Sequence, residues 1–402
     1  MSAKYLEEYE ATYTPKLVME EASRCLLCED APCSNSCPAG TDPAKFIRSV
    51  RFKNFKGAAE TIRENNILGG ICARVCPTER YCEKACSRCG IDKPINIGGI
   101  QKFVTDFEEA TKMDILEKKA PNGKRVAVVG SGPAGLSSAG YLAMEGFEVT
   151  VFERDSKAGG YLRYGIPEYR LPSKVVDNEI KKIQKLGVDI KTGTNIDNLE
   201  ELKKNYDAVI LAVGHSKGKT LPLFEGKRFA KTAVEFLHDA KKKKGNVKLP
   251  QNVLVIGGGD VAMDVVTTLK LLGVEQVTDV VYETFAEFKA SKKELQTAQN
   301  EGVSIIDGYV PVAVSGKTVK FKHRYIDSEI KIKSDLVILA VGQQTEAGAF
   351  GLNVNKLQEV EIKNSGNLFV AGDIAEGDKT VVHAVRTGKE VCFAVKKFLG
   401  VK

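Results

Sequence analysis

Two segments of this chain repeat one pattern, and the repeat is the strongest constraint on the fold. Each segment begins with a short apolar run and a glycine-rich loop, and each ends in Val-Ile-Leu-Ala-Val-Gly. One extends from Gly130 to Gly214 and the other from Gly257 to Gly342, spans of 84 and 85 residues. A strand, a glycine turn and a helix are typical of a nucleotide-binding α/β unit. We therefore expect two Rossmann-like domains of one design.

The first loop is Gly-x-Gly-x-x-Gly, directly after a strand expected at Lys124–Val129. The second glycine allows a pyrophosphate to approach the N-terminus of the helix expected at Pro133–Glu145, and the third allows helix and strand to pack closely. A second strand, Val149–Phe152, leads to Glu153, whose carboxylate could accept both hydroxyls of an adenosine ribose. The loop residues expected to bind this cofactor are Gly130, Ser131, Gly132, Pro133, Ala134 and Gly135.

Further cofactor contacts are expected downstream of this loop. Two adjacent glycines, Gly159 and Gly160, suggest close approach to a bulky flat ligand. A late strand, Asn367–Ile374, is expected to rejoin the first nucleotide domain, so that Asp373 reaches the ribityl or pyrophosphate groups of a flavin. The alternative is a surface Asp that caps the next turn. The residues expected to contact the cofactor here are Gly160, Leu162, Arg170, Gly372 and Asp373.

The second loop is Gly-x-Gly-x-x-Ala, between a strand at Asn252–Ile256 and a helix that extends to Leu272. A strand expected at Asp279–Tyr282 ends at Glu283, where a carboxylate would repel a 2′-phosphate. NADH is therefore expected rather than NADPH, although the nearby Lys289 weakens this inference. The loop residues expected to bind the dinucleotide are Gly257, Gly258, Gly259, Asp260, Val261 and Ala262.

Nine of the ten cysteines lie between Cys25 and Cys89. They occur as Cys-x2-Cys-x4-Cys-x3-Cys-Pro and Cys-x3-Cys-Pro-x4-Cys-x3-Cys-x2-Cys. Structural zinc requires Cys-x2-Cys pairs, and that spacing would leave five cysteines unused. The first run instead follows the ferredoxin pattern, in which the last cysteine ligates the other cluster. Two four-iron clusters, surrounded by small helices, use nearly all of the cysteines.

Charge and composition bear on whether the chain binds nucleic acid, spans a membrane or is secreted. The net charge of +7 is mild for 402 residues and gives no reason to expect nucleic acid binding. We expect the basic run Lys241–Lys244 to be a solvated helix end or loop. No apolar stretch approaches the ~18 residues of a membrane span, and the polar N-terminus is not a signal peptide. We expect a cytoplasmic protein, in which dense cysteines indicate metal or redox chemistry rather than disulfides.

Clusters and two nucleotide domains together imply a flavin, because a nicotinamide delivers hydride whereas a cluster accepts single electrons. Hydride transfer depends on stacking geometry, so no catalytic side chain is expected in this chain. A disulfide reductase would need a redox cysteine pair near the flavin, and no cysteine lies between Cys89 and Cys392. A non-enzymatic scaffold is disfavoured by the complete glycine loops.

The motifs now resemble a known family. The cysteine runs, both glycine loops, Ile166-Pro167, Arg170-Leu171-Pro172 and Ala371-Gly372-Asp373 occur in this order in the glutamate synthase small-subunit superfamily. Within it, Glu21–Leu26, Asp30–Cys33, Val75–Thr78 and Pro94–Gln101 look like dihydropyrimidine dehydrogenases, and the whole chain is similar to the flavin- and NADH-binding subunits of the bacterial NAD-dependent enzymes.

This resemblance implies ligands for both clusters. One would be held by Cys25, Cys28, Cys33 and Cys86, and the other by Cys37, Cys76, Cys82 and Gln101. Cys72 and Cys89 are then non-ligands, expected as buried thiols. The long NADPH-dependent enzymes have a basic pair where this chain has Tyr282-Glu283, which supports NADH.

The long enzymes of the family continue into an FMN-binding barrel that holds the pyrimidine and into a ferredoxin-like domain. Because this chain ends at Lys402, we expect it to pass electrons to a partner subunit with an FMN and iron–sulfur barrel, which interconverts uracil or thymine and the 5,6-dihydro forms. The alternative is a small subunit of glutamate synthase or of a ferredoxin-coupled NAD(P)H oxidoreductase. The expected domains are an all-α iron–sulfur domain over 1–115, an FAD domain over 118–215 and 346–402, and an NAD domain nested at 216–345.

Overall fold

A computed structural model describes residues 3–361 and 364–401. By its internal contacts the chain divides into two compact units. The larger unit comprises residues 10–163, 173–215 and 345–402, and the smaller comprises 1–9, 164–172 and 216–344. The division does not separate the cysteine region from the first nucleotide domain, so the expected three-domain boundaries remain a prediction.

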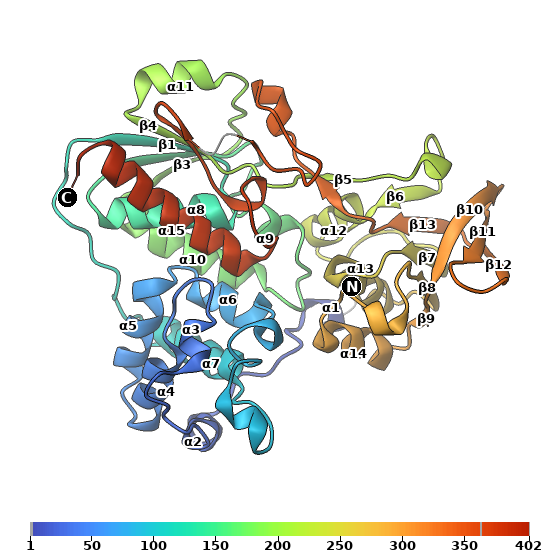
Figure 1. The fold of residues 1–402 in the computed structure, drawn as a ribbon, viewed down its shortest axis with the longest axis horizontal. Coiled ribbons are helices and arrows are strands. Elements are labelled where there is room, and N and C mark those ends of the chain that lie inside the picture. Colours follow the sequence, from blue (N-terminus) through green and yellow to red (C-terminus); the bar gives the residue numbers. More distant parts are fainter. Residues whose placement is uncertain (1–2, 362–363, 402) are drawn as a thin grey trace. The chain divides into compact units, whose positions relative to one another are not determined.

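The cysteine region of the larger unit is built of short helices (Figure 1). Its α-helices are α2 (Pro15–Ser23), α3 (Pro32–Asn35), α4 (Pro43–Arg51), α5 (Phe55–Asn65), α6 (Gly69–Val75) and α7 (Ile97–Ala110), with 3-10 turns at Thr78–Arg80 and Ser87–Gly90. Asp42 caps α4, because its side chain accepts a hydrogen bond from the backbone N–H of Lys45. Helices α4 and α5 are separate, because Lys53 between them adopts a φ of 59°, which a right-handed helix does not allow.

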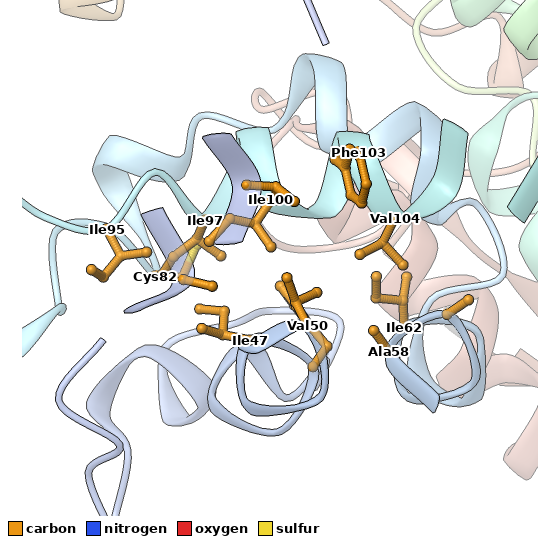
Figure 2. Packing of buried hydrophobic residues seen from close by; sticks show 14 residues of the cluster. Ile47, Val50, Ala58, Ile62, Cys82, Ile95, Ile97, Ile100, Phe103 and Val104 are labelled. Atoms are coloured by element: carbon orange, nitrogen blue, oxygen red, sulfur yellow. The ribbon is translucent and has the colours of Figure 1, made fainter. Parts of the chain in front are cut away.

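Side chains from these helices form one core (Figure 2). Ile47 and Val50 of α4, Ile62 of α5 and Val104 of α7 are fully buried within it. Cys82 belongs to the same core, and Cys25, Cys33 and Cys86 pack against it half-buried. Hydrophobic packing of the helices therefore helps to position these four cysteines.

The first nucleotide domain is a six-stranded sheet in the order β15-β16-β4-β1-β2-β3. Its strands are β1 (Arg125–Val129), β2 (Glu148–Phe152), β3 (Asp189–Lys191), β4 (Ala208–Leu211), β15 (Asn364–Ser365) and β16 (Leu368–Val370). The late strand β16 pairs in parallel with β4 and so rejoins the first nucleotide domain, as expected. The strand ends at Val370 rather than at Ile374, because Gly372–Ile374 forms a 3-10 turn. The helices of this domain are α8 (Pro133–Met144), α9 (Tyr161–Tyr164), α10 (Ser173–Lys185), α11 (Leu199–Asn205) and α15 (Val381–Phe398), with 3-10 turns at Ala347–Phe350 and Gly372–Ile374.

Helices cover both faces of this sheet, as near-continuous apolar strands require. Helix α15 lies along α8 in Figure 1, and Gly388 of α15 packs directly on the backbone of α8 at Ala134. On the other face, Leu199 and Leu202 of α11 pack on the strands.

The smaller unit holds the second nucleotide domain, a five-stranded sheet in the order β6-β13-β7-β8-β9. Its strands are β6 (Ala230–Thr232), β7 (Asn252–Ile256), β8 (Gln276–Val280), β9 (Ser304–Ile306) and β13 (Leu336–Leu339). One face packs on α12 (Ala233–Lys242), α13 (Asp260–Leu271) and α14 (Lys292–Asn300), and the other on a three-stranded sheet of β10 (Tyr309–Ser315), β11 (Thr318–His323) and β12 (Glu329–Lys333). The remaining elements are α1 (Ala3–Leu6), the pair β5 (Lys217–Gly218) and β14 (Gln343–Gln344), and 3-10 turns at Pro222–Phe224 and Phe285–Glu287.

Two expectations in this unit were wrong. The strand expected at Asp279–Tyr282 is β8, which begins at Gln276 and ends at Val280, so Glu283 lies beyond the strand. Lys241 was expected in a solvated basic run but is buried, and its Nζ donates to the carbonyl oxygens of Ile166 and Leu171 at 2.6 and 2.7 Å. Lys241 therefore anchors the segment 164–172 to α12.

Candidate functional site

The first glycine loop lies between β1 and α8, and its geometry suits a pyrophosphate. A Cβ on Gly135 would collide with the carbonyl oxygen of Gly130, so close packing of helix and strand requires glycine at that position. Gly132 is the N-cap of α8, and a Cβ added to it would meet no atom within 4 Å. The N-terminus of α8, with its unpaired N–H groups, therefore borders open space, as an anion site requires.

Ser131 and Glu153 fix the shape of this loop. The backbone N–H of Ser131 donates to Glu153 Oε2 at 3.0 Å, and its hydroxyl donates to the same oxygen. The N–H of Asp155 donates to Glu153 Oε1 at 2.8 Å, and the N–H of Gly159 donates to Ser131 Oγ at 2.9 Å. Glu153 is buried just after β2, and these hydrogen bonds fix its carboxylate. A ribose that bonded to Glu153 would share the carboxylate with the donors of Ser131 and Asp155.

Asp373 lies at the same end of the sheet, after β16. Gly372 packs against Ala134 of α8, and its N–H donates to Thr387 Oγ1 at 2.9 Å. Burial raises the pKa of Asp373, and the charges of His215 and Lys379 oppose that rise. No group in the described part of the chain donates a hydrogen bond to this carboxylate, which leaves it available to hydroxyl groups of a cofactor.

Three more residues were expected at the flavin site. Gly160 and Leu162 lie in the larger unit, and Arg170 lies in the smaller unit. Gly160 packs against the Cα of Gly132, and Leu162 is fully buried in the turn that follows. Arg170 instead lies in the smaller unit, where its Nη1 donates to both oxygens of Asp264 at 2.7 Å and its Nη2 pairs with Glu294 at 3.0 Å. Its guanidinium is engaged by these two carboxylates.

The second glycine loop repeats the geometry of the first. A Cβ on Gly257 would collide with the carbonyl oxygen of Ala340. A Cβ on Gly259, the N-cap of α13, would meet no atom within 4 Å. Val261 and Ala262 pack into the core of this domain. Asp260 accepts from the N–H of Ser291 at 2.6 Å and so holds the start of α14. A pyrophosphate would meet the N-terminus of α13 in the same way.

Charged side chains gather beyond β8, next to this loop. Glu283 Oε2 lies 3.0 Å from the position of a Cβ on Gly258, and Glu283 Oε1 pairs with Lys289 Nζ at 2.6 Å. Arg324 was not foreseen from the sequence. Its guanidinium carbon lies 3.9 Å from the ring centroid of Tyr282, and Nη1 donates to the carbonyl oxygen of Tyr282 at 3.0 Å and to Glu287 at 3.1 Å.

Four of the predicted cluster ligands line one pocket. Cys25, Cys28, Cys33 and Cys86 surround it, together with apolar residues such as Ile47 of α4. Burial raises the pKa of the Cys33 thiol to about 11 and raises that of Cys25. Within residues 3–361 and 364–401, no three His, Cys, Asp or Glu side chains converge as they would on a single metal ion. The four cysteines line this pocket from different parts of the cysteine region, and thiolates are the ligands that iron–sulfur clusters use.

In the second set Cys82 is buried, whereas Cys37, Cys76 and Gln101 are partly buried. Burial raises the pKa of the Cys76 thiol well above its ordinary value, and the neighbouring Cys72, Cys82 and Cys37 raise it further. Gln101 lies on α7, and its Nε2 donates to the carbonyl oxygen of Gly69 at 2.8 Å. Gly69 is the first residue of α6. Its side-chain oxygen receives no hydrogen bond from any described residue and so remains free to bind a metal.

The two cysteines expected as buried non-ligands differ in the structure. Cys72 is buried on α6, and burial raises its thiol pKa to about 12. Cys89 is exposed and lies 3.4 Å from the carbonyl oxygen of Glu83, so the expectation of burial was wrong there. Cys89 belongs to the 3-10 turn Ser87–Gly90, none of whose residues is buried.

A buried ion triad joins the cysteine region to the first nucleotide domain. Arg63 of α5 is 1 % exposed and pairs with Glu108 of α7 and Glu179 of α10, each at 2.6 Å. Each partner is more than 40 residues away in the sequence, so no local pattern indicated the triad. Tyr81, next to Cys82, donates to Asp378 at 2.9 Å and adds a second connection.

The comparisons with known proteins agree with this geometry. Residues 2–113 match the family described as dihydropyrimidine dehydrogenase domain II, 4Fe-4S cluster, and residues 124–388 match pyridine nucleotide-disulphide oxidoreductase. A thioredoxin reductase of T. acidophilum superposes with a TM-score of 0.56 at 19% identity, over 68% of this chain and 98% of that one. This likeness shows the fold alone. No helix of the described residues is long and apolar enough to cross a membrane.

The fold and the cysteine site define a flavin-dependent pyridine-nucleotide oxidoreductase with an iron–sulfur domain, and its cofactors are FAD, NAD(H) and [4Fe-4S] clusters. The chain belongs to the family of PreT, a subunit of NAD-dependent dihydropyrimidine dehydrogenase. It is 51% identical to PreT of Escherichia coli K12 over 98% of this chain and 97% of that one. It is 30% identical to the NADP(+)-dependent formate dehydrogenase subunit beta of Moorella thermoacetica, over 92% of this chain and 60% of the other.

Proposed function

We propose that the chain is the electron-input subunit of an NAD-dependent dihydropyrimidine dehydrogenase. Electrons from NADH would pass through FAD and two [4Fe-4S] clusters to a partner subunit, which holds FMN, further iron–sulfur clusters and the pyrimidine. The net reaction would be the reversible reduction of uracil or thymine to the 5,6-dihydro form. The observation that carries the proposal is a single chain with two glycine loops, each at a helix N-terminus beside open space, and a pocket lined by four cysteines.

The chain offers residues to hold each group. FAD would lie at the N-terminus of α8, with Glu153 on its ribose and Asp373 on its ribityl or pyrophosphate hydroxyls. NADH would lie at the N-terminus of α13, with Glu283 on its ribose. A flavin supplies the conversion of a hydride into single electrons. The chain's own residues bind and orient the two cofactors, and we propose no catalytic side chain.

The positions of the two cysteine sets support an order of transfer. Cys37 and Cys76 lie near residues that contact the first nucleotide domain. Lys389 of α15 lies near Cys37 and donates to Asn65 Oδ1 at 2.8 Å, and Tyr81 lies near Cys76 and donates to Asp378 at 2.9 Å. The pocket of Cys25 and Cys28 is bordered by Leu26, which is 46% exposed. The first set therefore suits exit to the partner, and the second suits uptake from FAD.

The test of the activity uses a reconstituted complex. The chain should copurify with a candidate FMN-barrel subunit, and the complex should catalyse NADH-dependent loss of uracil absorbance. The chain alone should bleach its own flavin with NADH but leave uracil unchanged. Activity with glutamine and 2-oxoglutarate, and none with uracil, would overturn the proposal and favour the glutamate synthase alternative.

Two glycine variants test the assignment of the cofactors. Gly132→Ala should lower the bound FAD, because its Cβ would occupy space that the pyrophosphate needs. Gly259→Ala should keep FAD but raise the KM for NADH in flavin reduction. Gly348→Ala, also without neighbours within 4 Å, is the matched control and should change neither. Equal FAD loss in Gly132→Ala and Gly259→Ala would contradict the assignment.

A further inference from the structure

Consecutive residues of α15 connect the first glycine loop with the second cysteine set. Gly388 packs on the backbone of Ala134, which belongs to the loop expected to bind the flavin. Lys389, the next residue, reaches the cysteine region, where its Nζ donates to the carbonyl oxygen of Ala39 at 3.3 Å. Ala39 lies two residues after Cys37 in the sequence. A single turn of α15 therefore contacts both the flavin loop and the chain next to a predicted cluster ligand.

The ammonium group of Lys389 has polar partners but no carboxylate partner. Its Nζ donates to Asn65 Oδ1 at 2.8 Å and lies 5.9 Å from the ring centroid of Tyr141. Within residues 3–361 and 364–401, no Asp or Glu forms an ion pair with it. The side chain is partly buried, so its charge is only partly compensated by water.

A partly buried cation is stabilised when an anion lies nearby. Cys37 lies close enough to Lys389 for their charges to interact. As an iron ligand Cys37 would be a thiolate, and a four-iron cluster with thiolate ligands carries a net negative charge. The predicted cluster of the second set would therefore supply the counter-charge that no carboxylate provides.

We propose that Lys389 raises the reduction potential of this cluster and so makes it the acceptor of electrons from the flavin. Each electron adds one negative charge to the cluster, with no bond formed or broken, and a nearby cation favours the reduced form. The donor is the flavin that NADH reduces, and two such transfers return it to its oxidised form with release of its proton. This inference rests on the proposed function and adds the residue that sets the first electron acceptor.

Redox titration of the anaerobically purified, iron-loaded chain, followed by EPR, measures the potential of each cluster. Lys389→Gln removes the charge but keeps a hydrogen-bond donor. It should lower the equilibrium constant for reduction of the second cluster roughly three- to tenfold, a shift of about 30–60 mV to more negative potential. Lys389→Arg keeps the charge and should keep the potential. Cys76→Ala, which should lack this cluster, identifies its signal.

A second variant tests the same charge without a change at residue 389. Asn65→Asp places a carboxylate where Nζ now has an acceptor at 2.8 Å, and it should also shift the potential of the second cluster to more negative values. Lys396→Met is the matched control, because Lys396 lies on the same helix and is also partly buried but pairs with Glu145. It should leave both potentials unchanged.

The outcomes separate this inference from the proposed function. If Cys76→Ala keeps both cluster signals, the ligand set and the proposed electron path are wrong. If both clusters are present and neither Lys389→Gln nor Asn65→Asp shifts the second potential, the inference alone is overturned. Equal shifts in Lys389→Gln and Lys389→Arg would also overturn it, because packing rather than charge would then be the cause. If Lys389→Gln does not retain iron, Asn65→Asp decides.

Discussion

Cys72 and Cys76 lie one helical turn apart at the end of α6, yet we expect only Cys76 to ligate iron. Burial raises the pKa of both thiols and both lie near Cys37, so Cys72 is a close comparison for Cys76. Cys72→Ala should leave the iron content of the purified chain unchanged, whereas Cys76→Ala should lower it. Iron analysis and visible absorbance measure both. Equal iron loss would mean that the ligand set is wrong.

Asp279 is a buried carboxyl group that we expect to lower the stability of the fold. It lies within β8, paired in register with Val255 and Ile305, and neither carboxylate oxygen has a hydrogen-bond partner. Burial raises its pKa well above the ordinary value. Asp279→Val should therefore stabilise the chain by about 1–3 kcal/mol near neutral pH, because it removes an unsatisfied polar group. Denaturant unfolding of the intact chain measures this change.

The gain from Asp279→Val should depend on pH. Below about pH 4 the carboxyl is protonated in both the folded and the unfolded states, so the gain is smallest there. As the pH rises, the unfolded chain loses this proton while the folded chain keeps it, and the unaltered protein loses stability relative to the variant. Thr278→Val, on the same strand and half-exposed, is the control and should show no such pH dependence. A gain that shrinks from pH 4 to pH 7 would contradict this account.

At the scale of elements, three helices depend on one buried cation. Arg63 of α5 holds Glu108 of α7 and Glu179 of α10, all nearly inaccessible to solvent. Arg63→Met would leave two buried carboxylates without a counter-charge and should destabilise the larger unit by about 3–5 kcal/mol. Combining it with Glu108→Leu and Glu179→Met should restore most of that loss, because apolar replacement of a buried ion network is often neutral.

A surface pair provides the comparison for the triad. Arg386→Met breaks an exposed pair with Glu390 at 2.7 Å on α15 and should cost at most about 0.5 kcal/mol. Chemical unfolding followed by far-UV circular dichroism measures all of these variants. If Arg63→Met behaves like Arg386→Met, the triad does not stabilise the junction between the cysteine region and the first nucleotide domain.

At the scale of the whole molecule, the two kinds of cofactor should be separable. The cysteines and the first glycine loop lie on different elements, so removal of iron under anaerobic conditions should leave FAD bound. The iron-free chain should still be bleached by NADH but should no longer support uracil reduction with the partner subunit. Flavin absorbance and the uracil assay measure the two steps. Persistence of uracil reduction without iron would place the exit route outside the cysteine region.

Much of the fold could be predicted from local sequence. Strands β1 and β7 and helices α8 and α13 lie within a residue or so of their expected bounds, because a strand, a glycine turn and a helix form from adjacent residues. Cys25, Cys28, Cys33 and Cys86 line one pocket, and their role as the ligands of one cluster stays a prediction. The end of β8 was misplaced by two residues, since Val281 and Tyr282 continue the apolar pattern after the strand pairing has stopped.

The sequence by itself determined the two glycine loops and the grouping of the cysteines, because these features depend on spacing along the chain. Only the tertiary structure decided the partners of Arg63, the burial of Lys241 and the stacking of Arg324, since each depends on residues that are distant in sequence. A long charged side chain is solvated unless folding brings it a partner. No local pattern specifies that partner, so the buried and stacked cations were the features that sequence reasoning missed.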